Sequence, residues 1–150
     1  MIKDLQLIPL KVNTDDRGCL IVIGSSGRED APDIPILKEV YFVGNMARGT
    51  IRAFHKHQNL WDYFFIARGS AKFVLVDDRP DGKKEINTFV LTERNPSLLV
   101  VPPGVYHGWM SLQDDTEMIS LANNPYNAKS PDEKRIAPDS FGDVWTIKGR

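Results

Sequence analysis

The chain has 150 residues, a length that fits one domain able to bury a hydrophobic core. Its contents of 41% hydrophobic and 26% charged residues are those of an ordinary globular protein, and they exclude an extended disordered or coiled-coil class. A formal net charge of −1 gives no general attraction to nucleic acid or to a membrane surface, so we expect neither as a partner. An anionic ligand must then be held by locally placed arginines.

The cysteine content and the N-terminal sequence bear on the cellular compartment. Cys19 is the single cysteine and cannot form an internal disulfide. The N-terminus lacks the basic-then-apolar pattern of a signal peptide, and no apolar run approaches the roughly 20 residues of a membrane span. We therefore expect a cytoplasmic protein.

The first third of the chain predicts short strands and one long loop. Residues 5–12 (LQLIPLKV) are expected to form an edge strand, because Pro9 cannot donate a hydrogen bond to a central ladder. The turn NTDDRG then leads into a strand at residues 19–23. Residues 24–36 are rich in Gly, Ser and Pro and predict a surface loop long enough to arch over a site, and residues 37–43 predict a further strand.

The remainder continues in the same pattern. Residues 61–78 predict two strands joined at an Arg-Gly turn, and further strands follow in INTFVL, SLLVV, VYHGWMSL and EMISLA. About nine or ten short strands at spacings near ten residues, with almost no helical periodicity, predict an all-β sandwich or jelly-roll barrel. Only residues 127–136 (NAKSPDEKRI) suggest a helical turn, with Ser130 as its N-cap.

All three histidines lie in two motifs with strand character. His55 and His57, in GTIRAFHKHQNLWDYFFIARG, are two apart, so on a regular strand both rings project to the same face. Asp62 follows five residues later, and His107 stands in LLVVPPGVYHGW behind a Pro-x-Gly turn. We interpret the motifs as two hairpins that deliver polar groups to one concave sheet face, which predicts a pocket in a small β-barrel.

The neighbours of the histidines carry further expectations. Arg52 is three residues from His55, so both side chains can enter one pocket only if a β-bulge intervenes. Tyr106 and Trp109 could belong either to the core or to a ligand site. A cluster of aromatic residues in the first motif is expected to form core and dimer interface: Trp61, Tyr63, Phe64 and Phe65.

The spacing G-x5-H-x-H-x4-D-x6-G followed by P-x-G-x2-H resembles the paired motifs of the cupin superfamily, with Asp62 at the usual glutamate position. An ordered series of elements (DDRG, RAFH, ARG, VDDR, PPGVYHGW, NPYNAKSPDEKRI and DxxGDxW) makes the chain most similar to the dTDP-4-dehydrorhamnose 3,5-epimerase family, as a short member. The resemblance implies a cupin jelly-roll barrel (double-stranded β-helix) over residues 1–150 as a single domain, and a homodimer.

The same resemblance implies catalytic roles. His55 matches the family's catalytic base, and Tyr126 matches the tyrosine that serves as acid on the opposite face of a dTDP-linked 4-keto-6-deoxyhexose. A 4-keto group acidifies the hydrogens on neighbouring carbons, so a histidine can remove one and a tyrosine can return it from the other side. His107 matches a pocket histidine. Asp62 replaces the family's enolate-stabilising lysine, and we expect it to take over from a C-terminal aspartate that orients the base in longer members.

Other positions match substrate-binding residues. Arg17 and Arg52 match arginines associated with the nucleotide diphosphate, and Arg17 is expected to reach the site of a partner subunit. Glu133 falls on an acidic position near the nucleotide end. We also assign His57 and Trp109 to substrate binding, and we expect neither a metal nor another cofactor.

Several alternatives stay open. Paired histidines are also a feature of the related dTDP-sugar 3,4-ketoisomerases, which move protons between carbons. A metal-dependent cupin would use His55, His57, Asp62 and His107 as a site for iron or manganese. A non-catalytic sugar-nucleotide binding protein is a third possibility. Asp62 could instead be a plain exposed strand residue, and Tyr126 a turn aromatic that packs over the barrel mouth.

Overall fold

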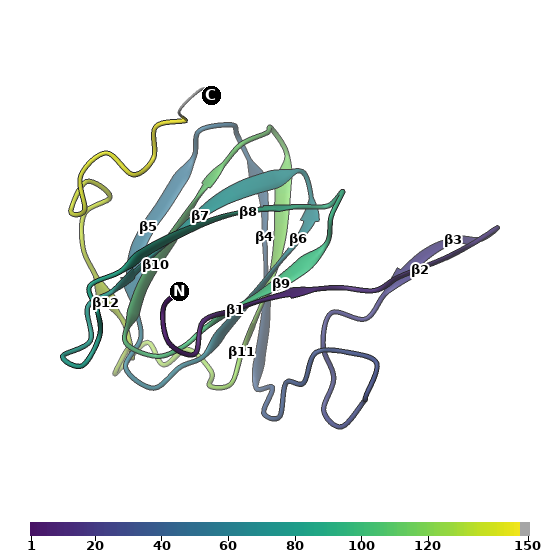
Figure 1. Ribbon diagram of the computed structural model, residues 1–150, viewed down its shortest axis with the longest axis horizontal. Helices are drawn as coiled ribbons and strands as arrows, with labels where there is room; N and C mark the ends of the chain where they lie inside the picture. Colours follow the sequence, from purple (N-terminus) through teal and green to yellow (C-terminus); the bar gives the residue numbers. More distant parts are fainter. Residues whose placement is uncertain (148–150) are drawn as a thin grey trace.

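The computed structural model describes residues 1–147, which contain twelve strands and no helix, so none of them forms a helical segment able to cross a membrane. Ten of the strands form two five-stranded sheets that face each other (Figure 1). In the first sheet the order is β1 (Gln6–Pro9), β9 (Ser97–Val101), β6 (Asp62–Arg68), β11 (Thr116–Ala122) and β4 (Glu39–Met46). In the second it is β12 (Lys134–Arg135), β5 (Ile51–Lys56), β10 (Val105–Ser111), β7 (Ser70–Asp77) and β8 (Ile86–Thr92).

The strand pairs follow the winding of a jelly roll. β4 pairs with β11, β5 with β10, β6 with β9 and β7 with β8, all antiparallel, and successive pairs alternate between the sheets. The predicted all-β jelly roll is confirmed. The prediction of two local hairpins was wrong, because the strands before and after the turn at residues 57–61 enter opposite sheets. Asp62 therefore faces the histidines from across the barrel.

The main core lies between the sheets. On β6, Phe64 and Ile66 point inward to this core, whereas Tyr63 and Phe65 belong to a second apolar cluster on the outer face of the first sheet. This alternation is the two-residue period of a strand. The assignment of the aromatic cluster to the core is thus confirmed for Tyr63, Phe64 and Phe65, and Trp61 packs partly buried against the outer cluster.

The N-terminal region departs from the sequence expectations in two ways. The expected strand at residues 5–12 is interrupted after Pro9, where the Leu10 N–H bonds to the Pro96 carbonyl and the chain leaves the barrel. It continues into a separate hairpin arm, β2 (Val12–Asp15) and β3 (Gly18–Ile21), which projects from the barrel (Figure 1).

The loop of residues 24–36 forms as expected but does not cover the main cavity. Its Ile34 is buried in the outer cluster of the first sheet, and no loop residue lines the cavity described below.

The expected helical turn near the C-terminus was also wrong. Residues 127–130 form a turn, and the chain then extends as β12 along the edge of β5. The Ile136 N–H bonds to the Phe54 carbonyl and the Phe54 N–H to the Ile136 carbonyl, each at 3.1 Å. Pairing with an open sheet edge satisfies more backbone groups than one isolated helical turn could.

Candidate active site

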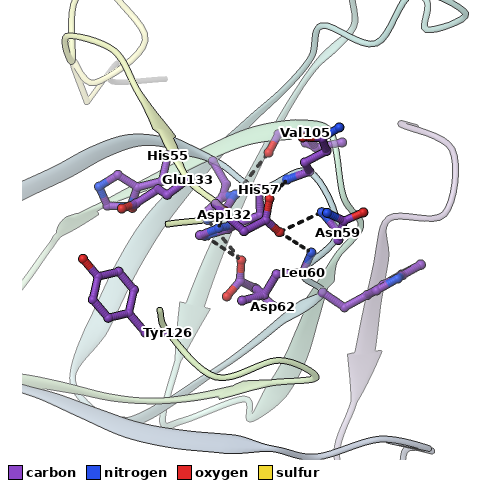
Figure 2. A network of polar contacts seen from close by, with 12 residues as sticks. His55, His57, Asn59, Leu60, Asp62, Val105, Tyr126, Asp132 and Glu133 are labelled. Atoms are coloured by element: carbon purple, nitrogen blue, oxygen red, sulfur yellow. Dashed lines mark hydrogen bonds and ion pairs between the residues drawn. The ribbon is translucent and has the colours of Figure 1, made fainter. Parts of the chain in front are cut away.

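A cavity of about 300 Å³ opens between the sheets at the end where the C-terminal segment crosses the barrel. Inward-facing residues of β4, β5, β6, β10 and β11 form its floor and walls, and residues 125–135 form its rim. Figure 2 shows the polar side chains that gather there. Eight of the nine residues assigned to the site from the sequence line this cavity: Arg52, His55, His57, Asp62, His107, Trp109, Tyr126 and Glu133.

A bulge on β5 brings Arg52 and His55 to the same side. His107 on β10 pairs with His55 and Trp109 pairs with Arg52, so two steps along β10 match three along β5. The extra residue reverses the alternation of side chains. The bulge that the sequence required is therefore present, and the Arg52 guanidinium lies over the Trp109 ring at 5.9 Å.

Asp62 forms a buried cluster with two histidines. Its Oδ2 lies 3.4 Å from His107 Nε2 and 3.6 Å from His57 Nε2. The opposite nitrogens face backbone carbonyls, because His107 Nδ1 lies 3.1 Å from the Val105 oxygen and His57 Nδ1 contacts that of Asp132. A carbonyl only accepts hydrogen bonds, so in both rings Nδ1 carries the proton and the lone pair of Nε2 points at Asp62.

Burial sets the charge of this cluster. Asp62 is only 3% exposed, and its Oδ2 has no hydrogen-bond donor. Burial, reinforced by Glu133 and Asp132, raises the pKa of Asp62 well above its usual value. Burial and the neighbouring His57 lower the pKa of His107 to about 3. The interpretation of Asp62 as an exposed strand residue was wrong.

His55 has a different carboxylate neighbour. Its Nδ1 lies 3.9 Å from Glu133 Oε1, whereas Asp62 faces the other two rings. Burial lowers the pKa of His55, and the nearby Glu133 partly opposes this shift. The expectation that Asp62 stands beside the base was therefore wrong. Glu133 thus lies beside His55, and its expected place near the nucleotide end stays a prediction.

The rim carries Tyr126, whose side chain remains accessible at 61% exposure. Its backbone N–H is held by the Glu39 carboxylate at 3.0 Å. Figure 2 shows the hydroxyl end of the ring directed towards the side of the cavity that holds His55 and Glu133. Tyr126 therefore lies in a different wall from His55, which comes from β5.

Arg17 is the one assigned residue that the structure does not bring to the cavity. It lies at the tip of the β2–β3 arm, with its side chain 85% exposed, and its guanidinium pairs with Asp15 of the same turn. Within one chain it is remote from the residues that line the cavity.

Sequence reasoning missed four ionisable residues that line the cavity: Glu39, Tyr41, Asp132 and Arg135. Tyr41 could have been recognised by its alternation with outward-facing positions of its strand. Burial, and next the Asp62 carboxylate, raise its pKa to about 12. Asp132 gave no local signal, because its partners are distant in sequence, and the place of Arg135 in the cavity wall depends on the edge pairing of β12.

Three groups in the described part of the chain are placed where a divalent ion could bind. The donor atoms of His57, Asp62 and His107 all lie within 4.8 Å of one another. The two bare Nε2 atoms and the unpaired carboxylate oxygen fit the preferences of such an ion. His55 does not belong to this group, so the four-residue set considered from the sequence is reduced to three.

Two five-stranded antiparallel sheets around a histidine-lined cavity define a cupin-type jelly roll. The family model for dTDP-4-dehydrorhamnose 3,5-epimerase matches residues 1–146, and the chain belongs to this family.

Three known proteins illustrate the similarity. The chain is 31% identical over 142 residues to the probable low-salt glycan biosynthesis epimerase Agl13 of Haloferax volcanii, with 92% of this chain and 89% of that protein covered. It is 38% identical over 107 residues to the spore coat polysaccharide biosynthesis protein SpsL of Bacillus subtilis, covering 68% and 71%. A double mutant of the 3,4-ketoisomerase QdtA from Thermoanaerobacterium thermosaccharolyticum, solved in complex with TDP, superposes with a TM-score of 0.71 at 26% identity, covering 91% of this chain and 90% of that chain.

Proposed function

We propose that the protein is a metal-free isomerase of a dTDP-linked 4-keto-6-deoxyhexose, with His55 as the base and Tyr126 as the acid. The observation that carries the proposal is the placement of His55 and Tyr126 on different walls of one cavity in a chain of this family. The names of two relatives, a glycan epimerase and a spore coat polysaccharide protein, support a role in supplying sugars for glycan synthesis.

The proton transfers follow from the charge states. His55 is neutral near pH 7 because burial lowers its pKa, so it can accept a proton from the carbon next to the keto group. The C–H electron pair becomes the enolate, and Tyr126 donates its hydroxyl proton to the same carbon from the other face. Solvent then restores both groups. Arg52 and Arg135 are the arginines that line the cavity and can balance the charge of the enolate and the diphosphate.

A homodimer completes the proposed site. Arg17 is exposed on an arm that projects from its own barrel, so it is free to reach the diphosphate in a partner's cavity. The related QdtA structure contains TDP, which supports a dTDP-linked ligand for this protein. We also propose a cytoplasmic location, in line with the exposed free thiol of Cys19.

Product analysis tests the proposed activity. The native protein is incubated with dTDP-4-keto-6-deoxyglucose, and the products are identified by NMR. We expect a sugar inverted at a carbon next to the keto group, and we expect His55→Asn to bind the nucleotide sugar within a few fold of the native affinity but to form no product. Tight binding without any change in the sugar would instead identify a non-catalytic sugar-nucleotide binding protein.

Transfer of the keto group is the second candidate. A 3,4-ketoisomerase moves a proton between neighbouring carbons, and His57 lies in the same cavity as His55. The same NMR experiment separates the activities, because only the ketoisomerase turns carbon 4 into an alcohol and carbon 3 into the ketone. His57→Asn should abolish that reaction, whereas the epimerase should lose less.

A metal-dependent cupin is the third candidate, and the group of His57, Asp62 and His107 favours it. A divalent ion bound there would supply a Lewis acid for a substrate oxygen. Metal analysis of protein purified without chelators tests this candidate. Stoichiometric iron, manganese or zinc, with activity lost on chelation and restored by the ion, would replace the metal-free proposal.

A further inference from the structure

We propose that Glu133 is the positioning residue of His55, holding the ring with its proton on Nδ1 so that Nε2 stays bare for the substrate. This inference rests on the proposed function, because it concerns the same base. Glu133 Oε1 lies 3.9 Å from His55 Nδ1, and the side chains of the two residues are only 12% and 19% exposed. The separation of 3.9 Å is longer than a direct hydrogen bond, and it fits a bridging water or a contact that tightens when substrate fills the cavity.

The Glu133 carboxylate is fixed on its other side. Arg135 donates a hydrogen bond from Nε to Oε2 at 2.9 Å, and its Nη2 forms an ion pair with the same oxygen at 2.8 Å. Both contacts use one oxygen, which leaves Oε1 directed at His55. A carboxylate held by a planar guanidinium loses little freedom when it orients a further group.

The backbone holds the segment of Glu133 beside the strand of His55 through contacts on both sides of Glu133. Arg135 of β12 pairs with His55 of β5, and the next pair is closed by reciprocal bonds between Ile136 and Phe54. On the other side of Glu133, the Asp132 carboxylate accepts bonds from three backbone N–H groups of residues 58–60. Figure 2 shows the bonds between Asp132 and the backbone of Asn59 and Leu60, with Glu133 beside His55. The strand that carries the base therefore also locates its carboxylate.

The other carboxylates around the cavity are engaged elsewhere. Among the described residues, four acidic side chains line it, and Glu133 is the one paired with His55. Asp62 faces His57 and His107, and Glu39 binds the Tyr126 backbone. Asp132 uses its oxygens on the turn at residues 58–60. Glu133 is thus the group in place to select the tautomer of His55.

The tautomer is measured first in the native protein. Nitrogen-15 NMR of the neutral His55 ring at pH 8, assigned by its disappearance in His55→Asn, distinguishes a proton on Nδ1 from one on Nε2. We expect the Nδ1–H form in the native protein and a mixture of both forms in Glu133→Ala. A native ring protonated on Nε2, or an unchanged tautomer in Glu133→Ala, would overturn the proposal.

Kinetics give the second readout. Glu133→Ala should lower kcat by about 10- to 100-fold, as for other groups that orient a reactive histidine, with KM within about threefold. Glu133→Asp should recover part of the loss. Asp78→Asn is the matched control, because it removes a carboxylate paired with Lys56 outside the cavity and should leave kcat unchanged. Equal kcat for Glu133→Ala and the control would contradict the role.

The two readouts separate this inference from the proposed function. If the native protein converts no dTDP-linked keto sugar, the proposed function fails, and the tautomer of His55 still decides whether Glu133 orients it. If turnover is present but Glu133→Ala changes neither the tautomer of His55 nor kcat, only the positioning role fails.

Discussion

At the scale of single residues, the site depends on which ring nitrogen each histidine leaves bare. Backbone carbonyls bind Nδ1 of His57 and His107 and turn both Nε2 atoms towards Asp62. His55 differs, because its Nδ1 faces a carboxylate and its ring lines the open cavity. The same residue type is therefore suited to two tasks, a buried polar cluster and a base, by its partners alone.

Tyr126→Phe tests the division of labour between base and acid. Without the phenol, His55 should still remove the carbon-bound proton and return one from solvent to the same face. We expect deuterium exchange from heavy water to continue within about tenfold of the native rate, while formation of the inverted product falls by about 100-fold or more. Mass spectrometry for deuterium and NMR for configuration check the two rates. Equal loss of both would remove Tyr126 from the role of acid.

Asp62 and His107 make opposite contributions to the pH dependence of stability. The pKa of His107 falls from 6.5 to about 3 on folding, so its contribution is lost as the pH drops below 6.5, by about 2 kcal/mol at pH 5. The pKa of Asp62 is raised above 3.8, so its contribution is full at low pH and is lost as the pH rises. Between pH 6.5 and 3.8 the two slopes oppose each other.

Asp62→Asn should therefore expose the acid sensitivity of His107. We expect the variant to lose about 2 kcal/mol of unfolding free energy between pH 7.5 and pH 5, and the native protein to lose less, because Asp62 gains stability as the pH falls. Urea denaturation at the two pH values measures the difference. A native protein and a variant that lose the same free energy would contradict the opposed titrations.

At the scale of elements, the contact between β5 and β10 sets the geometry of the base. A Cβ at Gly108 would lie 2.3 Å from the Ala53 Cβ and 2.9 Å from the Arg52 carbonyl oxygen, so this strand pair requires a glycine. In Gly108→Ala the added methyl group should push the bulge of β5 away from β10 and destabilise the protein by about 1–3 kcal/mol. We expect kcat to fall more than the nucleotide affinity, and thermal denaturation with steady-state kinetics checks both. A variant of native stability and kcat would show that the close approach is unnecessary.

Local patterns in the sequence predicted where the strands lie better than they predicted which distant residues contact one another. The spacing of Arg52 and His55 was enough to require a bulge, and the turn-and-strand cadence was enough for an all-β barrel. The role of Asp132 could not be predicted, because its carboxylate binds backbone groups 72–74 residues away. A local reading therefore placed it in the first turn of a helix. The connection at residues 57–61 was likewise predicted as a hairpin turn, because the sequence does not show that β5 and β6 enter different sheets.

At the scale of the whole molecule, exposed apolar side chains indicate how two copies could associate. Val40 and Phe42 point outward from the edge strand β4, with Phe42 61% exposed, and Leu20 is exposed on the projecting arm. Edge strands with apolar surface are commonly covered by a second subunit. We expect a homodimer in which the arm packs on the partner.

Sedimentation tests the assembly. The native protein should sediment as a dimer at micromolar concentration, and Phe42→Asp should shift the equilibrium towards monomer. The surface variant Lys83→Ala, in the exposed turn between β7 and β8, is the control and should remain dimeric. A stable native monomer would contradict the dimer and would leave Arg17 without access to any cavity.

Deuterium wash-in tests the central claim most directly. The native protein, dialysed against a chelator, is incubated in heavy water with dTDP-4-keto-6-deoxyglucose, and the label at the carbons next to the keto group is followed by mass spectrometry and NMR. Metal-free abstraction by His55 predicts rapid incorporation that chelation does not reduce and that His55→Asn abolishes while nucleotide binding persists. Equal incorporation by His55→Asn, or incorporation that returns only when a divalent ion is added back, would contradict it.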